Sequence, residues 1–280
     1  MKKCHVIIIA FVLFGLSAAF AAAAVVVVAS TTATTTAKPA QTADEQLKKG
    51  DEFYAQHKDA EALEAYLAAV QVDPKSYEAA WKACRSMIDM GDLVDLKAKG
   101  GEERQKKFFK DSEAYARKAV GLNPNDTQGH FFLSAALGKY ALMLGKKDQI
   151  AMSREIKTEI EKAIELDPTN DLAYHALGRW HRRIAEIGGA QRFFGSIFFG
   201  KIPKGSFVES EQALKKAAEL KPDYLNHHLE LARTYVAMDK YKEAVAEFQK
   251  TIDLPTSTSK DPEYKKEAEA EMAKAKKKVK

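Results

Sequence analysis

Ala163-Ile164-Glu165-Leu166-Asp167-Pro168 closes an amphipathic stretch in the middle of the chain, and four other places end in a similar way. Those closures are Val72-Asp73-Pro74, Leu122-Asn123-Pro124, Leu220-Lys221-Pro222 and the shortened Leu254-Pro255. Proline cannot continue a helix, and it pushes the residue before it out of the α region. The pattern therefore predicts an array of helices with regularly placed ends.

The residues between the closures follow the order of a tetratricopeptide (TPR) repeat, in which about 34 residues form two antiparallel helices. Small residues let the two helices touch, and large ones fill the gap to the next pair. In the first unit these positions are Gly50, Phe53, Ala62, Tyr66 and Ala69. We therefore predict an all-α, right-handed TPR solenoid of about five helix pairs over residues 43–258. Residues 259–280 are expected to form a charged C-terminal helix or tail.

The repeats are not uniform. Their closing prolines lie 50, 44, 54 and 33 residues apart, so three units carry insertions beyond the usual length of about 34 residues. The insertion at residues 188–207 is unusually apolar and contains Phe193, Phe194, Phe198 and Phe199. Soluble proteins rarely leave so much apolar surface uncovered. We expect these rings either to dock onto the solenoid or to form a surface for a membrane or a partner.

The N-terminus has the order of an export signal. Met1-Lys2-Lys3 is basic, and residues 6–29 carry no charge, which is typical of a signal peptide that is removed. Because the uncharged run is also long enough to span a bilayer, an uncleaved anchor is the alternative. Residues 1–29 are therefore predicted to be a signal peptide or membrane anchor, and residues 30–42 a flexible Thr/Ala-rich leader. The expected location is periplasmic or secreted, or membrane-anchored.

Cysteine content and charge argue against a disulfide-stabilised protein and against a nucleic-acid-binding protein. Loss of Lys2 and Lys3 with the leader would lower the formal charge from +5 to +3 and leave Cys84 as the only cysteine, so no internal disulfide could form. We expect Cys84 to lie in the core, since it stands where the repeat requires a small residue. Interleaved Glu and Lys indicate solvated helix faces rather than a nucleic-acid surface.

Motifs for enzyme chemistry are missing from the sequence. Gly145-Lys146-Lys147 lacks the first glycine and the hydroxyl of a phosphate-binding loop, and no His-Glu-x-x-His motif occurs. His227 and His228 are adjacent, so on a helix they point about 100° apart and chelate poorly. The protein is therefore predicted not to be an enzyme. It is also predicted to need no metal and no other cofactor.

Arginines recur at equivalent positions of the predicted first helices. Arg85, Arg179 and Arg233 are ninth in their helices, and Arg182 is twelfth and His175 fifth in the fourth unit. In TPR arrays these positions line the concave groove, and guanidinium groups suit carboxylates and phosphates. The alternative is that nearby carboxylates neutralise them. Apolar residues on the same face are Trp81, Phe131 and Leu229, so the groove is predicted to be amphipathic.

Three segments carry a family resemblance: Leu177-Gly178-Arg179-Trp180, residues 199–207 and residues 227–235. Together they resemble the C-terminal half of the regulator of microtubule dynamics (RMD) family and its bacterial relatives. The resemblance covers roughly residues 45–255. It implies a TPR domain, and for animal members an association with microtubules, mitochondria or membrane contact sites, with lipid binding by the repeats in some.

These observations favour an exported, non-enzymatic TPR module or scaffold. Its concave groove is predicted to bind a peptide or protein segment. The arginines that are expected to line the groove favour an acidic segment. A lipid-binding or lipid-transfer protein and an RMD-like cytoskeleton or membrane-contact protein are the alternatives. No nucleic-acid partner is expected, and an uncleaved N-terminus would keep the protein near a membrane.

Overall fold

The computed structural model describes residues 42–189, 192, 195 and 202–279. Within them it contains helices and no strand. The helices are α1 (Ala43–Ala55), α2 (Asp59–Val72), α3 (Tyr77–Asp92), α4 (Gly101–Leu122), α5 (Thr127–Leu142), α6 (Lys146–Leu166), α7 (Asp171–Ala185), α9 (Phe207–Leu220), α10 (Leu225–Ala237), α11 (Tyr241–Asp253) and α12 (Asp261–Lys276). The predicted signal peptide or anchor at residues 1–29, the predicted leader at 30–42 apart from Thr42, and the rings of Phe193, Phe194, Phe198 and Phe199 lie outside the described residues.

Four of the closing prolines, Pro74, Pro124, Pro168 and Pro222, each lie in a tight turn between the second helix of one unit and the first helix of the next. The residue before it is extended, as at Asp73 (φ −125°, ψ 94°) and Asp167 (φ −142°, ψ 96°). The same carboxylates accept a hydrogen bond from the backbone two residues on, from Lys75 at 2.9 Å and Thr169 at 2.8 Å. These local bonds make the Asp-Pro sequence a turn as well as a helix stop.

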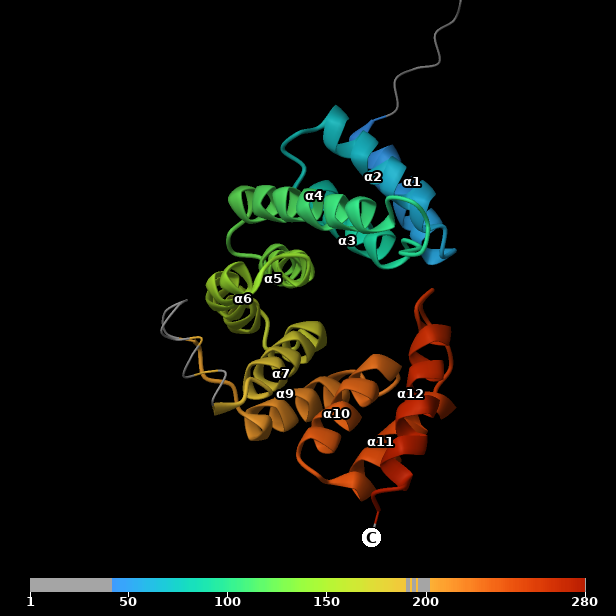
Figure 1. The fold of residues 1–280 in the computed structure, drawn as a ribbon. Coiled ribbons are helices and arrows are strands. Elements are labelled where there is room, and N and C mark those ends of the chain that lie inside the picture. Colours follow the sequence, from blue (N-terminus) through green and yellow to red (C-terminus); the bar gives the residue numbers. More distant parts are fainter. Residues whose placement is uncertain (1–41, 190–191, 193–194, 196–201, 280) are drawn as a thin grey trace, which may run out of the picture. The chain divides into compact units, whose positions relative to one another are not determined.

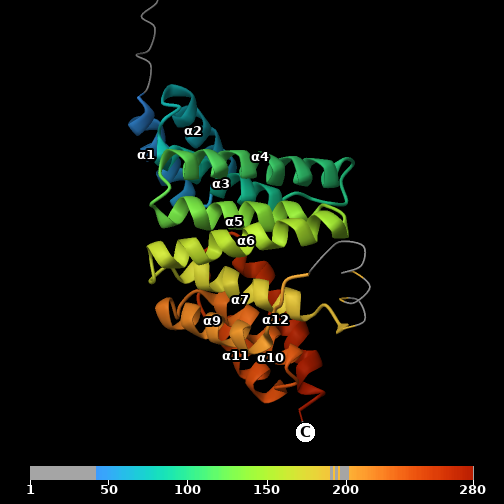
Figure 2. The same cartoon turned by 90° about the vertical axis from the view of Figure 1, so that its left-hand side faces the viewer.

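Adjacent helices pack in pairs, and the pairs stack on one another (Figures 1 and 2). The pairs are α1 with α2, α3 with α4, α5 with α6, α7 with α9, and α10 with α11. Within the compact unit of residues 41–280, the first helix of each of four pairs lies on the inner side of the array (Figure 1). These helices are α3, α5, α7 and α10. The predicted all-helical, TPR-like fold is confirmed.

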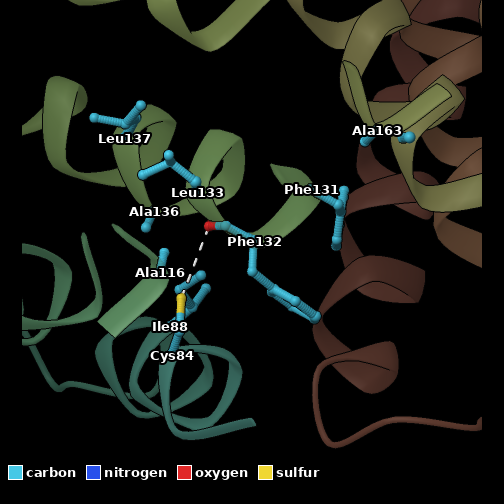
Figure 3. Close-up of a cluster of buried hydrophobic side chains, with 10 residues drawn as sticks. Cys84, Ile88, Ala116, Phe131, Phe132, Leu133, Ala136, Leu137 and Ala163 are labelled. Carbon is cyan, nitrogen blue, oxygen red and sulfur yellow. Dashed lines mark hydrogen bonds between the residues drawn. The ribbon is translucent and has the colours of Figure 1, made fainter. Parts of the chain in front are cut away.

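Buried alanines and aromatic residues form the core between the pairs. In the cluster of Figure 3, Ala116 and Ala136 are fully buried beside Phe132. Cys84 is also fully buried, and its Sγ lies 3.7 Å from the carbonyl oxygen of Phe132. Burial raises the pKa of this thiol, so the thiolate is disfavoured. The prediction that Cys84 belongs to the core is confirmed.

Close approach of the two helices in a pair depends on glycine at Gly50 and Gly178. A Cβ at Gly50 would lie 2.5 Å from the ring of Tyr66, and one at Gly178 would lie 2.5 Å from Cγ of Leu214. Both are below the distance that real Cβ atoms tolerate. The repeat pattern predicts small residues where paired helices touch, and both glycines lie at such contacts.

Gly178→Leu is expected to lower the free energy of unfolding by about 1–3 kcal/mol, although leucine is the better helix former. The new side chain would force α7 away from α9. Thermal melts measure the effect, with Gly138→Leu as control because a Cβ there would meet no atom within 4 Å. The control should melt at or above the wild-type temperature. An unchanged melting temperature for Gly178→Leu would contradict the contact.

The C-terminal segment, predicted as a helix or a tail, is the helix α12 in the structure. It packs against α11 and α10, and Ala268 and Ala275 are buried on its inner face. Its N-terminal end begins at the buried Asp261, whose carboxylate accepts hydrogen bonds from the backbone of Ser257 and Thr258. The preceding residue Lys260 donates to the main-chain oxygen of Asp92 at 2.9 Å. This bond joins the start of α12 to the end of α3.

Candidate functional site

A buried carboxylate forms ion pairs with arginines of the fourth unit (α7 and α9) and the fifth unit (α10 and α11). The side chain of Glu230 on α10 is 4% exposed and faces three arginines. It pairs with Arg182 on α7, with Arg233 at 2.9 Å, and more distantly with Arg179, whose Nε lies 3.6 Å from Oε2. We call these four residues the Glu230 cluster. Burial acts to raise the pKa of Glu230, but the guanidinium groups outweigh it and hold that pKa well below its usual range.

The cluster also holds α12 in place. Arg233 donates to Glu267 at 2.9 Å and to Glu271 at 2.6 Å, both on α12. Arg182 is 8% exposed and pairs with Glu186 as well as Glu230. These two predicted groove arginines therefore have internal partners, and we leave them out of the ligand contacts proposed below.

Two buried histidines connect α7 with α10. Nδ1 of His175 lies 3.0 Å from Nδ1 of His227, and Nε2 of His227 lies 2.9 Å from Asp171. Because a carboxylate only accepts, His227 donates through Nε2, and its Nδ1 then accepts from His175. Burial lowers the pKa of both imidazoles, and the neighbouring His227 lowers that of His175 further. The pair therefore shares one proton across the contact between its Nδ1 atoms and is neutral near pH 7.

His228 points away from this pair, as adjacent residues on a helix should. Its Nδ1 lies 2.7 Å from Glu247 on α11, and its Nε2 lies 3.0 Å from the Pro222 carbonyl oxygen. The predicted divergence of His227 and His228 is confirmed. Among the described residues no group of three or more His, Cys, Asp or Glu could hold a metal ion.

A pocket of about 270 Å³ opens between α5, α6 and α7, and we call it the α5–α7 pocket. Apolar side chains form most of its wall: Phe131, Ala135, Ile156, Ile160, Ala176, Trp180 and Ile184. Three cationic residues also line the pocket: Lys139, Arg179 and Arg183. His175, which is neutral, lies beside them in the lining. Lys139 is held by Asp92, with one oxygen at 2.6 Å. The arrangement suits a ligand with an apolar body and one negative group.

Three of the residues predicted to line the groove meet at this pocket: Phe131, His175 and Arg179. Trp81 and Arg85 belong to α3 and do not line it. Trp81 stacks on Phe132 with ring centroids 5.4 Å apart, and Arg85 lies 3.5 Å from the ring centroid of Tyr54.

Leu229 is a correction to the predicted groove face. It is fully buried in a hydrophobic cluster with Phe248, because α11 and α12 both pack against α10.

Sequence reasoning missed Arg183, Lys139 and Gly138 as pocket residues. Arg183 was recognisable, since it follows Arg179 by four positions and so lies on the same face of one helix. Lys139 and Gly138 carried no signal of their own, because their role depends on how α5 packs beside α7.

The comparisons with known proteins agree with this architecture. A family model described as "RMD1-3: Regulator of microtubule dynamics protein 1-3" matches residues 46–276. The chain belongs to this family. The match confirms the predicted resemblance and extends it through α12.

Two relatives show how far this RMD family member resembles curated proteins. Regulator of microtubule dynamics protein 1 of Bos taurus is 28% identical over 193 residues, which are 68% of this chain and 59% of the relative. The Caenorhabditis elegans protein of the same name is 24% identical over 184 residues, 66% of this chain and 79% of the relative. The aligned part thus spans about three fifths of the mammalian relatives.

A solved structure supports the fold assignment. The crystal structure of a thermophilic TPR protein from Thermus thermophilus superposes with a TM-score of 0.59 and 16% sequence identity. The alignment covers 84% of this chain and 98% of that one. The RMD family member therefore has a TPR-like fold.

Proposed function

We propose that this protein is a non-enzymatic TPR module whose concave side binds a segment of a partner protein through a carboxylate. The observation that carries the proposal is Arg179. Its side chain is 37% exposed and lines the apolar α5–α7 pocket, while the nearest carboxylate, Glu230, is 3.6 Å away and shared with two other arginines. A guanidinium group in this position retains donors for a ligand carboxylate.

The surroundings of Cys84 and of three buried histidines support a binding role. The buried thiol of Cys84 has a raised pKa, and His175, His227 and His228 all take part in internal hydrogen bonds. A nucleophile needs a neighbouring base and access to substrate, and Cys84 has neither access nor a depressed pKa.

The location of the protein is part of the proposal. The basic start and the uncharged run of residues 6–29 support export to the periplasm or beyond, or an uncleaved anchor near a membrane. Among the described residues no helix combines the length and the apolar character needed to cross a bilayer.

A lipid ligand is the second candidate, and the apolar wall of the α5–α7 pocket favours it. Its volume of about 270 Å³ lies below the roughly 300–1,000 Å³ of sites that enclose most of a drug-sized ligand. A lipid would therefore leave most of its chain outside, and we place the protein segment first.

Arg179→Gln is expected to weaken peptide binding by about tenfold to a hundredfold, since a charge-assisted hydrogen bond contributes about 1.5–3 kcal/mol. Binders would be selected from a synthetic peptide library against the purified protein and measured by fluorescence anisotropy. Arg117→Gln is the matched control, because Arg117 lies on α4 and pairs with Glu113 and Glu155. The control should bind as wild type does. Equal affinity for Arg179→Gln would overturn the role of this arginine.

A further inference from the structure

One edge of the helix array carries exposed apolar side chains together with exposed lysines. It consists of the connection between α3 and α4, the connection between α5 and α6, and the start of α9, which lie on the right-hand side of Figure 2. We call residues 93–100, 142–148 and 202–208 the loop edge. We propose that the loop edge docks onto the surface of a bilayer that contains anionic phospholipids. The inference goes beyond the proposed function, because it concerns a surface other than the α5–α7 pocket.

Exposed large apolar side chains are concentrated on the loop edge. Leu93 and Leu96 lie in the first connection, Leu142 begins the second, and Val208 lies in the first turn of α9. These four side chains are between 46% and 57% exposed. The other large apolar side chains that the described residues expose are Val72, Leu122 and Val279. More than half of this exposed apolar set therefore lies along one edge.

Internal hydrogen bonds hold both connections in a fixed conformation. In the first, the carboxylate of Asp95 accepts from the backbone N–H of Lys97 at 2.9 Å. In the second, the side-chain amide of Gln149 donates to the main-chain oxygen of Leu144 at 2.9 Å. The connections are thus ordered with their leucines on the surface, so the apolar side chains are available to a partner without any unfolding.

Charge complementarity assigns an anionic partner to the loop edge. Its lysines are all exposed, namely Lys97, Lys99, Lys146, Lys147 and Lys204. None of the five has an ion-pair partner among the described residues, whereas Lys107 and Lys215 on the faces of α4 and α9 pair with carboxylates. The loop edge contains two aspartates against these five lysines, a formal charge of +3. Its lysines are therefore free to contact the headgroups of anionic lipids.

The arrangement of the apolar side chains favours a bilayer over a folded protein. They are spread along three successive helix pairs, since Leu96, Leu142 and Val208 each belong to a different pair. A folded partner would need a surface of matching shape to cover such a row. A headgroup layer adapts to the row, and interfacial binding grows with both the apolar area that enters and the attraction of basic residues to anionic lipid.

The first test places a fluorescent reporter on the loop edge. Full-length Leu142→Trp is mixed with vesicles of phosphatidylglycerol and brominated phosphatidylcholine, whose bromine atoms quench tryptophan within the bilayer. Its emission should shift to shorter wavelength and lose intensity. The matched control is Leu122→Trp, at an exposed leucine that ends α4 on the opposite edge (Figure 2). It should not be quenched, and Trp81 and Trp180 give both variants the same background.

The second test removes the charge complementarity. In the Leu142→Trp protein, Lys97→Glu combined with Lys146→Glu should raise the lipid concentration for half-maximal quenching at least about tenfold, because basic residues near the surface are attracted to anionic lipid. The control is Lys110→Glu combined with Lys118→Glu on α4, which changes the net charge equally away from the loop edge. It should be quenched as the parent is, and all variants should keep the wild-type melting temperature.

The outcomes decide whether this edge meets a membrane. All the proteins share one N-terminus, so a difference between Leu142→Trp and Leu122→Trp reports the loop edge itself. Equal quenching of the two, no quenching of Leu142→Trp, or quenching that ignores the lysine reversals would overturn the inference. Self-association of wild type in sedimentation equilibrium, abolished by the lysine reversals and without quenching, would assign the edge to a second copy of the chain and overturn it as well. Peptide binding by the α5–α7 pocket is measured separately, so the two proposals fail independently.

Discussion

Glu230→Gln is expected to lower the free energy of unfolding by about 3–5 kcal/mol, the usual cost of removing one partner of a buried ion pair. Glutamine keeps the shape of the side chain but removes the charge that faces three arginines. Arg182 would suffer most, because its side chain is only 8% exposed and would lose its main counter-charge. Urea unfolding at pH 7 measures the loss.

Glu267→Gln is the control for this prediction. Glu267 is 41% exposed and bonds only one nitrogen of Arg233, which keeps Glu271 and Glu230 as partners. An exposed pair of this kind contributes about 0–1 kcal/mol. Similar small losses for both variants would show that the Glu230 cluster is solvated and does not hold α7, α10 and α12 together.

Acidification should destabilise the protein through His175 and His227, by about 2–4 kcal/mol between pH 7.5 and 5.0. In the unfolded chain both imidazoles take up protons near pH 6.5. In the folded protein burial lowers both pKa values, so the unfolded state binds more protons below that pH and stability falls with it. Proton uptake by both rings would set two N–H groups against each other across the 3.0 Å contact.

The surroundings of the pair contain charges of both signs. Arg179 and Arg182 lower the pKa of His175 while Glu230 raises it, and Asp171 opposes the effect of burial on His227. Protonation of Asp89, which lies elsewhere in the protein, has the opposite effect on stability at low pH. Burial raises its pKa to about 6, so the folded state takes up that proton as the pH falls towards 5 and gains stability.

His175→Asn separates these contributions. Asparagine can still donate to His227 but does not titrate, and Asp89 is the same in both proteins. Urea unfolding at pH 7.5, 6.5 and 5.0 should give the variant about 2 kcal/mol less loss than wild type over this range. Parallel pH profiles for the two proteins would mean that His175 is protonated as readily in the folded state as in the unfolded chain.

The repeat architecture was predictable because it depends on local chemistry. Asp167 and Pro168 form a turn whatever lies around them, since the proline stops the helix and the carboxylate bonds a following backbone amide. Gly178 was predictable as a contact point because paired helices of this length need a small residue where they meet.

The candidate site was only partly predictable. Phe131, His175 and Arg179 were placed on a common face by position within the repeat, and the structure brings all three to one pocket. The same rule failed for Leu229, because α12 adds a helix that covers unit five. It also could not tell that Arg233 is held by Glu267 and Glu271, which follow it by more than about thirty residues.

The ends of the helices, their pairing and the small residues between them can be predicted from the sequence, because each depends on neighbours within one repeat. Which arginines are paired with internal carboxylates depends instead on the tertiary structure. The side chains of Arg179 and Arg182 differ through their distances to one carboxylate on another helix. Such distances are set by how α7, α10 and α12 pack together, and electrostatic energy changes steeply with distance and burial.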